Sequence, residues 1–559
     1  MVDTPPGWHQ IVVFSFCSAM NQRSEGYSVS DAQRLAAEVG NRRTFAIISH
    51  PDAGKTTLTE KLLLYSGMVR TAGMVRGRKG SKATSSDWMG MEQERGISIT
   101  ASAMQFPYKG RIINVLDTPG HQDFSEDTYR TLTAADSAIM VIDAAKGVEE
   151  QTKKLFTVCR MRSIPILTFI NKLDLPSREM LDLLHEVESV LGIQSSPRNW
   201  PIGYGREFAG VVDRARDVAV LFERSEKGGT LKAGVNEVPL GDVERWVDGP
   251  VTAQLREELE LLDIAGNSFD RDQFLAGEMT PVFFGSALTN YGVEPFFDAF
   301  LDLAPSPRAY QATGSAGNPE VIDPVTTPFS GYVFKIQANM NPRHRDSMAF
   351  VRVCSGRFER DMVVKHHRTG KEVRLARSYS MVAQDRDTVE DAYPGDIVGV
   401  INPGLYAIGD TISVQRDFNF LPMPQFPPEV MAQVRPKDVL RLKAFEKGLD
   451  QLSNEGAIQI MRSWQHPSDP PFVAAVGKLQ FEVLEYRLRE EYGVTVGIDF
   501  LPYKFSSYLK GDPATLRKTQ GSYLALDKAG RVVLLCTSEW ERRFVGEQNP
   551  HHALEDFLS

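Results

Sequence analysis

The chain has 559 residues, of which 42% are hydrophobic and 24% are charged, and a formal net charge of −9. That length is too great for one hydrophobic core, and the composition is that of an ordinary globular protein, so we expect about three or four domains. The negative charge argues against a broad DNA-binding surface, because such surfaces are basic, and confines any nucleic-acid contact to local patches.

The cysteines and the N-terminal segment indicate in which cellular compartment we expect the protein. The four cysteines show no paired or metal-like spacing, which favours a reducing, cytoplasmic setting over a disulfide framework or zinc site. No run of about 18 apolar residues is present, so we expect no transmembrane helix. The apolar stretch 11–20 has no lysine or arginine before it, so we interpret residues 1–30 as a poorly ordered leader and not as a signal peptide.

In residues 31–310, short apolar strands alternate with amphipathic helices. We expect strands at 44–50, 111–118, 137–144, 165–172 and 281–288. Near-continuous apolar strands separated by helices predict an α/β domain with a parallel sheet covered on both faces. Residues from about 200 to 280 interrupt this alternation with a hairpin-like turn and a helix, and we interpret them as an inserted subdomain.

The rest of the chain predicts two further domains. Residues 311–326 are rich in Pro, Gly, Ala and Ser and are typical of a linker. Short strands with regular turn signals in 327–420 predict an antiparallel β-barrel. In residues 428–559 the order strand, helix, two strands, helix, strand predicts a C-terminal α+β domain of the ferredoxin-like type. The last fifty residues are less readable.

Residues 49–57 match the second half of a phosphate-binding loop between a strand and a helix. In such a loop, backbone N–H groups and the helix N-terminus bind the α- and β-phosphates, Lys55 reaches the β- and γ-phosphates, and Thr56 ligates Mg²⁺. Ser49 stands where the pattern has its first glycine. Glycine there serves a tight turn, and the later N–H groups do not depend on it, so we interpret the loop as functional. Taken alone, the stretch is also compatible with an ordinary strand–turn–helix.

The motif at residues 117–120, Asp-Thr-Pro-Gly, ends the strand that begins at Arg111. Asp117 is suited to hold Mg²⁺ through water, and Gly120 to offer its N–H to a γ-phosphate. His121 follows where many small GTPases have a glutamine that positions water, and an imidazole could do the same. A helix-start histidine with a satisfied hydrogen bond is an equal alternative.

The motifs at residues 171–174 and 286–288 select the base. Asp174 can accept two hydrogen bonds from the N1–H and amine of guanine, a pair that adenine does not offer, while the stem of Lys172 can lie over the ring. The N–H of Ala287 could donate to guanine O6. Each motif alone is weak, but four in this order, each at a strand end, predict a guanine-nucleotide switch.

The predicted GTP-binding residues form four groups along the chain. They are Ser49, His50, Pro51, Asp52, Ala53, Gly54, Lys55, Thr56 and Thr57; Asp117, Thr118, Pro119 and Gly120; Asn171, Lys172, Leu173 and Asp174; and Ser286, Ala287 and Leu288. The stretch 69–82 has five basic residues and no acidic one, and is either a solvated loop or a contact for RNA phosphates.

The stretches 85–100, 117–152 and 344–356 resemble the translational GTPases of the elongation factor G group. Within that group, 49–57, 95–100 and 334–346 are similar to the class II bacterial release factors, the peptide chain release factor 3 family. The resemblance covers about residues 31–500. It implies an α/β P-loop GTPase domain with an inserted subdomain, an antiparallel β-barrel domain and a C-terminal α+β (ferredoxin-like) domain.

The resemblance also implies a mechanism. GTP and Mg²⁺ are expected as cofactors, with Ser98 as a third metal ligand beside Thr56 and Asp117, because serine keeps the hydroxyl of the threonine found in elongation factors. His121 is expected to turn toward the attacking water on the ribosome, past a gate that maps to Ile97 and to Pro51, which replaces a valine. GTP hydrolysis ends in a conformational switch.

The expected function is ribosome-dependent GTP hydrolysis in translation termination, with dissociation of class I release factors after peptide release. The expected partners are the ribosome and class I release factors, without DNA or membrane, and the chain is expected to be a cytoplasmic monomer. Two alternatives are another ribosomal GTPase, which is translocase-like or protects ribosomes, and a guanine-nucleotide-regulated scaffold with little turnover. The chain ends soon after the ferredoxin-like pattern, which disfavours the first, and His121 with Asp117 disfavours the second.

Overall fold

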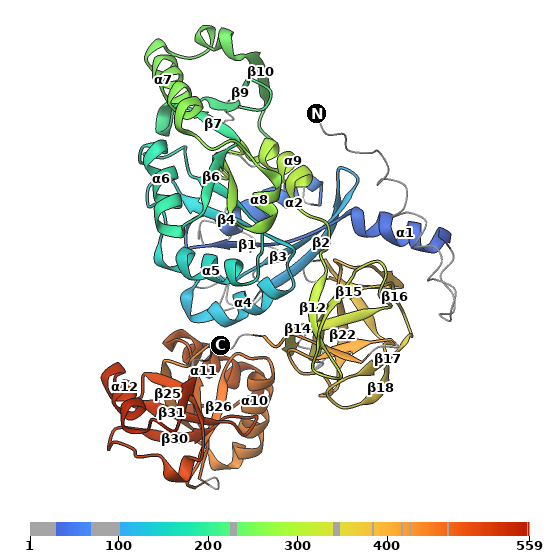
Figure 1. Ribbon diagram of the computed structural model, residues 1–559, viewed down its shortest axis with the longest axis vertical. Helices are drawn as coiled ribbons and strands as arrows, with labels where there is room; N and C mark the ends of the chain where they lie inside the picture. The colour runs from blue at the N-terminus through green and yellow to red at the C-terminus, as the bar shows by residue number, and fades with distance from the viewer. Residues whose placement is uncertain are drawn as a thin grey trace, which may run out of the picture.

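The computed structural model describes most of the chain, and Figure 1 shows it as three bodies. The described residues are 29–68, 101–223, 232–338, 347–382, 385–414, 417–423, 426–466, 469–555 and 557. An α/β body occupies the top of the view, a β-rich body the lower right, and a mixed α and β body the lower left. All but the last two residues of the expected leader lie outside the described residues.

The first body is built on a seven-stranded sheet in the order β2-β3-β1-β4-β5-β11-β6. Its strands are β1 (Arg42–Ser49), β2 (Ser102–Tyr108), β3 (Arg111–Asp117), β4 (Ser137–Asp143), β5 (Ile166–Asn171), β6 (Gln194–Pro197) and β11 (Met279–Phe284). All neighbours are parallel except β2 and β3. The five strands expected from apolar runs are present, which confirms the α/β prediction. The edge strands β2 and β6 were not expected, because neither has a continuous apolar run.

Helices cover both faces of this sheet, since successive side chains of a strand point to opposite sides. Phe45 and Ile47 of β1 belong to one core with α2 and α9, whereas Ala46 and Ile48 belong to the other core with α4, α5 and α6. The helices are α2 (Lys55–Ser66), α4 (Ser125–Thr133), α5 (Glu150–Met161), α6 (Met180–Leu191) and α9 (Val293–Leu303). Strands buried on both faces explain the continuous apolar runs in the sequence.

The interruption of the α/β alternation is a small antiparallel sheet in the order β10-β9-β8-β7. Its elements are β7 (Asn199–Ile202), β8 (Gly210–Asp213), β9 (Val218–Phe222) and β10 (Val235–Pro239), followed by α7 (Gly249–Ala265). In Figure 1 this subdomain lies at the far end of the first body, away from the other two bodies. The Asn199 side chain hydrogen-bonds to Phe284 of β11 and so joins this subdomain to the main sheet.

The second body is an eight-stranded antiparallel sheet in the order β18-β17-β23-β14-β15-β22-β19-β20. Its strands are β14 (Ser330–Ala338), β15 (Ser347–Ser355), β17 (Val363–His366), β18 (Lys371–Arg374), β19 (Ser378–Val382), β20 (Asp385–Thr388), β22 (Ile397–Asn402) and β23 (Thr411–Ser413). It encloses a core that includes Val333, Val351 and Ile412. This confirms the expected antiparallel β-barrel.

The expected linker, residues 311–326, is not irregular. Strands β12 (Tyr310–Gly314) and β13 (Pro319–Ile322) form a hairpin, and β12 also pairs with β24 (Phe418–Phe420), which follows the barrel. Pro319 opens the edge strand, where no N–H is needed for the sheet. The Pro and Gly signals in this segment are therefore the turns and edges of a small sheet that closes the barrel domain.

The third body begins with strand, helix, strand, strand, helix, strand, as expected. These are β25 (Val430–Pro436), α10 (Leu442–Asn454), β26 (Gln459–Ser463), β27 (Phe472–Ala475), α11 (Lys478–Tyr492) and β28 (Val496–Phe500). Their order, β28-β25-β27-β26, is that of the ferredoxin-like fold. The later strands β29 (Phe505–Lys510), β30 (Tyr523–Leu526), β31 (Val532–Cys536) and β32 (Ala553–Glu555) extend the same sheet beyond β26, with α12 (Glu539–Gln548). The last fifty residues, which are less readable in the sequence, thus contribute strands to this sheet.

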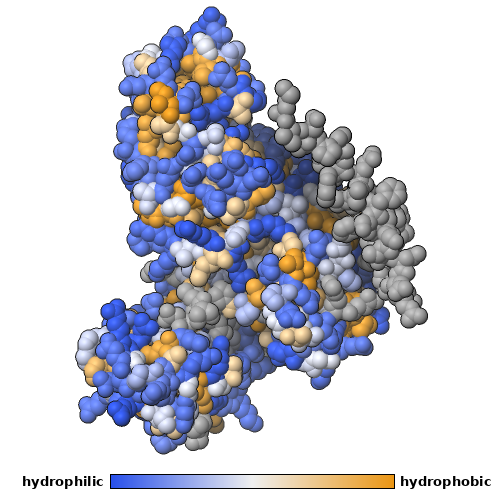
Figure 2. Space-filling view, viewed as in Figure 1, coloured by the Kyte–Doolittle hydropathy of each residue, from blue (hydrophilic) through white to orange (hydrophobic). Residues whose placement is uncertain are grey.

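None of the helices in the described ranges has the length and apolar character required to cross a membrane. On the face seen in Figure 2, hydrophilic side chains predominate on all three bodies and hydrophobic ones are scattered.

Candidate nucleotide site

The loop between β1 and α2 contains two residues with left-handed backbone. Asp52 has φ +65° and Gly54, the N-cap of α2, has φ +99°. A Cβ on Gly54 would also overlap the Asn171 amide, so this position requires glycine for two reasons. Ser49 is not among the residues with positive φ. The departure from the glycine pattern at Ser49 therefore costs the loop no backbone strain.

Lys55 and Asp117 meet inside this loop. The Lys55 Nζ lies 2.6 Å from Asp117 Oδ1, and the two side chains are only 6% and 2% exposed. The other carboxylate oxygen, Asp117 Oδ2, is buried without a hydrogen-bond partner, as is the Ser49 hydroxyl. The Thr118 hydroxyl donates to the Ile47 carbonyl at 2.6 Å and ties the loop after β3 to β1. A buried, unpartnered carboxylate oxygen at the start of α2 fits a hard cation such as Mg²⁺.

Asn171 joins the phosphate loop to the loop after β11. Its amide Nδ2 donates to the Ala53 carbonyl and its Oδ1 accepts the N–H of Ala287, both at 2.8 Å. The Ala287 N–H, expected to face a guanine, is thus directed at Asn171. The Ser286 hydroxyl donates to Asp174 Oδ1 at 2.6 Å, and this bond orients the carboxylate that is expected to read the base.

Lys172 has a partner that the sequence did not reveal. It adopts φ +72°, and its Nζ donates to Asp143 Oδ2 at 2.8 Å. Asp143 is the last residue of β4, which pairs with β5 so that Asp143 faces Asn171. Because Asp143 is an acidic residue at the end of an apolar strand, the sequence could have indicated that its side chain lies at the same edge of the sheet as the four motifs. The ion pair with Asp143 holds the side chain of Lys172 in place.

His121 lies in the turn after β3, with its side chain 35% exposed. Its Nδ1 accepts the Asp123 N–H at 3.3 Å and lies 3.4 Å from Asp123 Oδ1. The ring also meets Phe124 edge-on, with centroids 6.2 Å apart. Both polar contacts are on Nδ1, so Asp123, which the sequence did not single out, determines which way the imidazole faces.

The structure brings the four predicted groups together at one edge of the sheet. The loops follow β1, β3, β5 and β11, which run parallel and end at the same edge. Pro51 lies over Gly120, whose Cβ position would be 3.6 Å from Pro51 Cα. Leu288 is 48% exposed and lies at the periphery of the site. Ser98, Ile97 and the basic stretch 69–82 lie outside the described residues.

Three family models match successive parts of the chain. The elongation factor Tu GTP-binding domain matches residues 40–306, elongation factor G domain 2 matches 328–415, and the "Class II release factor RF3, C-terminal domain" matches 420–546. The first of these includes all four predicted groups, so the chain has a GTP-binding domain.

Relatives are similar over nearly the whole chain. Peptide chain release factor 3 of Symbiobacterium thermophilum is 53% identical over 520 residues, which are 92% of this chain and 97% of the relative. The same-named protein of Gloeobacter violaceus is 54% identical over 523 residues, with the same coverage. A crystal structure from Thermus thermophilus has a TM-score of 0.65 at 24% identity, covers 88% of this chain and 71% of that one, and supports the fold alone.

More than half of the aligned residues are thus shared with release factors along almost their entire length, and the C-terminal domain matches the model specific to them. The chain belongs to the peptide chain release factor 3 family and is a GTPase of translation termination.

Proposed function

We propose that this GTPase binds the ribosome after peptide release, drives the dissociation of the class I release factor, and leaves when its GTP is hydrolysed. The observation that carries this proposal is the meeting of four guanine-nucleotide motifs at one edge of the sheet in a chain of this family. The chemistry is transfer of the γ-phosphoryl group to water, in which positioning and charge neutralisation do most of the work.

The phosphates would lie against residues 49–57. Backbone N–H groups of the loop and the N-terminus of α2 would bind them there, and Lys55 would exchange its contact with Asp117 for the β- and γ-phosphates. Mg²⁺, when bound, neutralises developing charge on the phosphates. We propose Thr56, Ser98 and Asp117 as the residues that hold it, directly or through water; the unpartnered Asp117 Oδ2 supports this assignment.

Asp174 would read the base. Its carboxylate is held by Ser286, and it can accept both the N1–H and the amine of guanine. Asn171 would brace the phosphate loop against the 286–288 loop. His121 would orient the attacking water through Nε2, since Nδ1 is occupied by Asp123.

The partners follow from the same proposal. The ribosome and the class I release factor are the proposed macromolecular partners, neither DNA nor a membrane takes part, and the factor acts as a monomer in the cytoplasm. The basic stretch 69–82 is proposed to contact RNA phosphate. We also propose the domain limits 31–310 with an insertion at about 200–280, 327–420 and 428–559.

Recycling of a labelled class I release factor tests the function. Termination ribosomes carrying that factor are mixed with this protein and GTP, GDP or a non-hydrolysable GTP analogue. We expect GTP to accelerate loss of the label, and the analogue to leave this protein on the ribosome. Release that is no faster with GTP than without this protein would contradict the proposal.

Asp174→Asn tests base recognition with a built-in rescue. The amide cannot accept both guanine hydrogen bonds, so we expect GTP affinity to fall by about 100-fold. Xanthosine triphosphate presents a carbonyl in place of the amine and should restore binding and hydrolysis. Unchanged preference for GTP would remove Asp174 from the base site.

A further inference from the structure

The turn that contains His121 contacts the C-terminal domain through Asp123. Asp123 Oδ2 accepts the N–H of Leu479 at 2.7 Å, across 356 residues of sequence. Leu479 is the second residue of α11, so its N–H is one of the donors that a helix cannot satisfy internally. The N-cap residue itself is Gly477, which has no side chain to offer. A carboxylate from another domain therefore caps this helix.

The fit around Asp123 is close. A Cβ on Gly477 would overlap the Asp123 carboxyl group. The backbone of Gly477 is extended, with φ −144° and ψ 167°, a conformation open to any residue. Glycine is thus required at this position by the approach of Asp123 and not by its own backbone.

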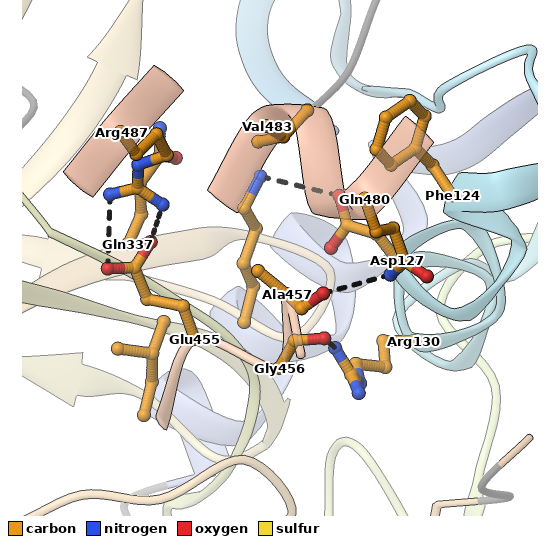
Figure 3. A pocket seen from close by; sticks show the side chains of 12 residues that line it. Phe124, Asp127, Arg130, Gln337, Glu455, Gly456, Ala457, Gln480, Val483 and Arg487 are labelled. Carbon is orange, nitrogen blue, oxygen red and sulfur yellow. Dashed lines mark hydrogen bonds and ion pairs between the residues drawn. The ribbon is translucent and has the colours of Figure 1, made fainter. Parts of the chain in front are cut away.

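Further contacts surround this cap at the junction of the three domains. Phe124 forms a buried cluster with Val483 of α11, and Arg130 of α4 donates to the Gly456 carbonyl at 3.1 Å. Figure 3 shows the pocket there: Phe124 and Arg130 lie on its right side, with Val483 and Gly456 facing them. The turn after β3 and the following helix α4 are thus the part of the GTPase domain on which the C-terminal domain rests.

The same α4 reaches the residue that follows the segment 69–100. Asp127 Oδ2 accepts the Ala101 N–H at 2.7 Å, and Lys335 of the barrel donates to the Ala101 carbonyl. Lys335 Nζ lies 3.8 Å from Asp127 Oδ2. Ala101 and the His121 turn are therefore both connected to α4 and to neighbouring domains.

We propose that Asp123 is a positioning residue that couples His121 to the docking of the C-terminal domain. While α11 is docked, Asp123 Oδ2 accepts the Leu479 N–H, and Asp123 Oδ1 lies 3.4 Å from His121 Nδ1, which accepts the Asp123 backbone N–H. When α11 moves away, the carboxylate is released from Leu479 and accepts a hydrogen bond from His121 in the tautomer that carries its proton on Nδ1, which leaves Nε2 as an acceptor directed toward the attacking water. This inference rests on the proposed role of His121. It adds that docking of the C-terminal domain controls the orientation of the His121 imidazole.

Gly477→Ala tests the coupling from the side that does not touch the nucleotide. The added methyl displaces the Asp123 carboxylate from α11, so we expect GTP hydrolysis without ribosomes to rise about fivefold, the equilibrium equivalent of one helix cap. Gly497→Ala is the matched control, because it makes the same change in the same domain where a Cβ meets nothing within 4 Å. Hydrogen exchange of the peptide that contains Leu479 reports docking independently of activity, and should rise only in Gly477→Ala.

Asp123→Asn tests the coupling from the side of the GTPase domain. The amide oxygen still accepts the Leu479 N–H, but the charge beside His121 is lost. We expect ribosome-stimulated turnover to fall about tenfold, which is less than the roughly 10²–10⁴-fold contributed by a group that itself transfers the proton, because Asp123 acts only through His121. GTP affinity, ribosome affinity and Leu479 exchange should stay unchanged. The two variants then move hydrolysis in opposite directions, which a merely structural role of Asp123 would not produce.

The proposal would be overturned if the Leu479 N–H of Gly477→Ala exchanged at the wild-type rate, or if it exchanged faster while GTP hydrolysis did not. It would also be overturned if the faster hydrolysis of Gly477→Ala persisted after His121→Ala was added. The single variant His121→Ala distinguishes a failure of the Asp123 coupling from a failure of the proposed function. If it keeps ribosome-stimulated hydrolysis, the assignment of His121 fails, whereas its loss together with an inert Gly477→Ala refutes only the coupling.

Discussion

At the scale of single residues, the phosphate loop tolerates change where the backbone is ordinary and not where it is left-handed. Ser49 replaces a pattern glycine at a position without positive φ. Gly54 combines φ +99° with the close approach of the Asn171 amide. The second glycine of the motif is therefore the one on which the geometry of the loop depends.

Gly54→Ala should abolish GDP binding, because the methyl displaces Asn171 and the loop N–H groups with it. Gly67→Ala is the control at the other end of α2: Gly67 also has positive φ, +80°, but a Cβ there meets nothing within 4 Å. We expect Gly67→Ala to lower the free energy of unfolding by about 1 kcal/mol and to keep GDP affinity. Calorimetric titration with GDP and denaturant unfolding measure the two effects. Equal GDP affinity in both variants would contradict the role of Gly54.

At the scale of elements, the buried side chain of Asn199 is one of the contacts that tie the inserted sheet to the main sheet. Asn199 of β7 donates from Nδ2 to the Phe284 carbonyl at 3.0 Å and accepts the Phe284 N–H on Oδ1 at 2.7 Å. It therefore continues the hydrogen bonding of β11 just before the 286–288 loop. The aromatic rings of Trp200 and Phe284 meet edge-on beside it.

Asn199→Ala should lower the free energy of unfolding by about 2–4 kcal/mol, because it leaves both backbone groups of Phe284 buried without partners. It should also weaken GDP binding, since the 286–288 loop follows directly. Asn236→Ala, at a half-exposed site in β10, is the control and should change neither quantity measurably. Denaturant unfolding measures the free energy of unfolding, and titration with GDP measures the affinity. A loss of stability in Asn199→Ala no larger than in the control would show that Phe284 finds other partners.

At the scale of the whole molecule, the barrel and the C-terminal domain contact the GTPase domain in different ways. Arg352 of β15 forms an ion pair with Asp136 at 2.5 Å, with both side chains fully buried. Burial is the largest single influence on the pKa of Arg352 and lowers it, but Asp136, Tyr310 and Cys354 together raise it by more, so the net pKa lies above its ordinary value. The C-terminal domain instead rests on α4 and the His121 turn. We therefore expect the barrel to move with the GTPase domain, and the C-terminal domain to separate from it more easily.

Arg352→Met should lower the free energy of unfolding by about 3–5 kcal/mol, because it leaves the Asp136 carboxylate buried without its partner. The double variant Arg352→Met with Asp136→Leu removes both charges and should recover most of that loss. Denaturant unfolding of the two single variants and the double variant measures the coupling. Additive losses would mean that the pair does not act as a unit.

The sequence predicted most of the fold and most of the candidate site, and particular residues show why. The strands β1, β3, β4, β5 and β11 are continuous apolar runs, and such patterns are local. The polar edge strand β6 and the hairpin of β12 and β13 were missed, because short edge strands rich in polar residues, Pro and Gly resemble loops. Asp143 was missed because its partner Lys172 lies far along the chain, in the loop after the next strand of the sheet.

By itself, the sequence determined the α/β alternation, the order of the four motifs and the choice of guanine, because each of these depends on residue types at short spacings. Only the tertiary structure decided which distant groups meet: Asp123 with Leu479, and Asp136 with Arg352. These pairs join separate domains, and no local pattern records them, because a carboxylate that caps a helix or pairs with a buried arginine looks the same in sequence as a solvated one. The packing of the domains creates both contacts.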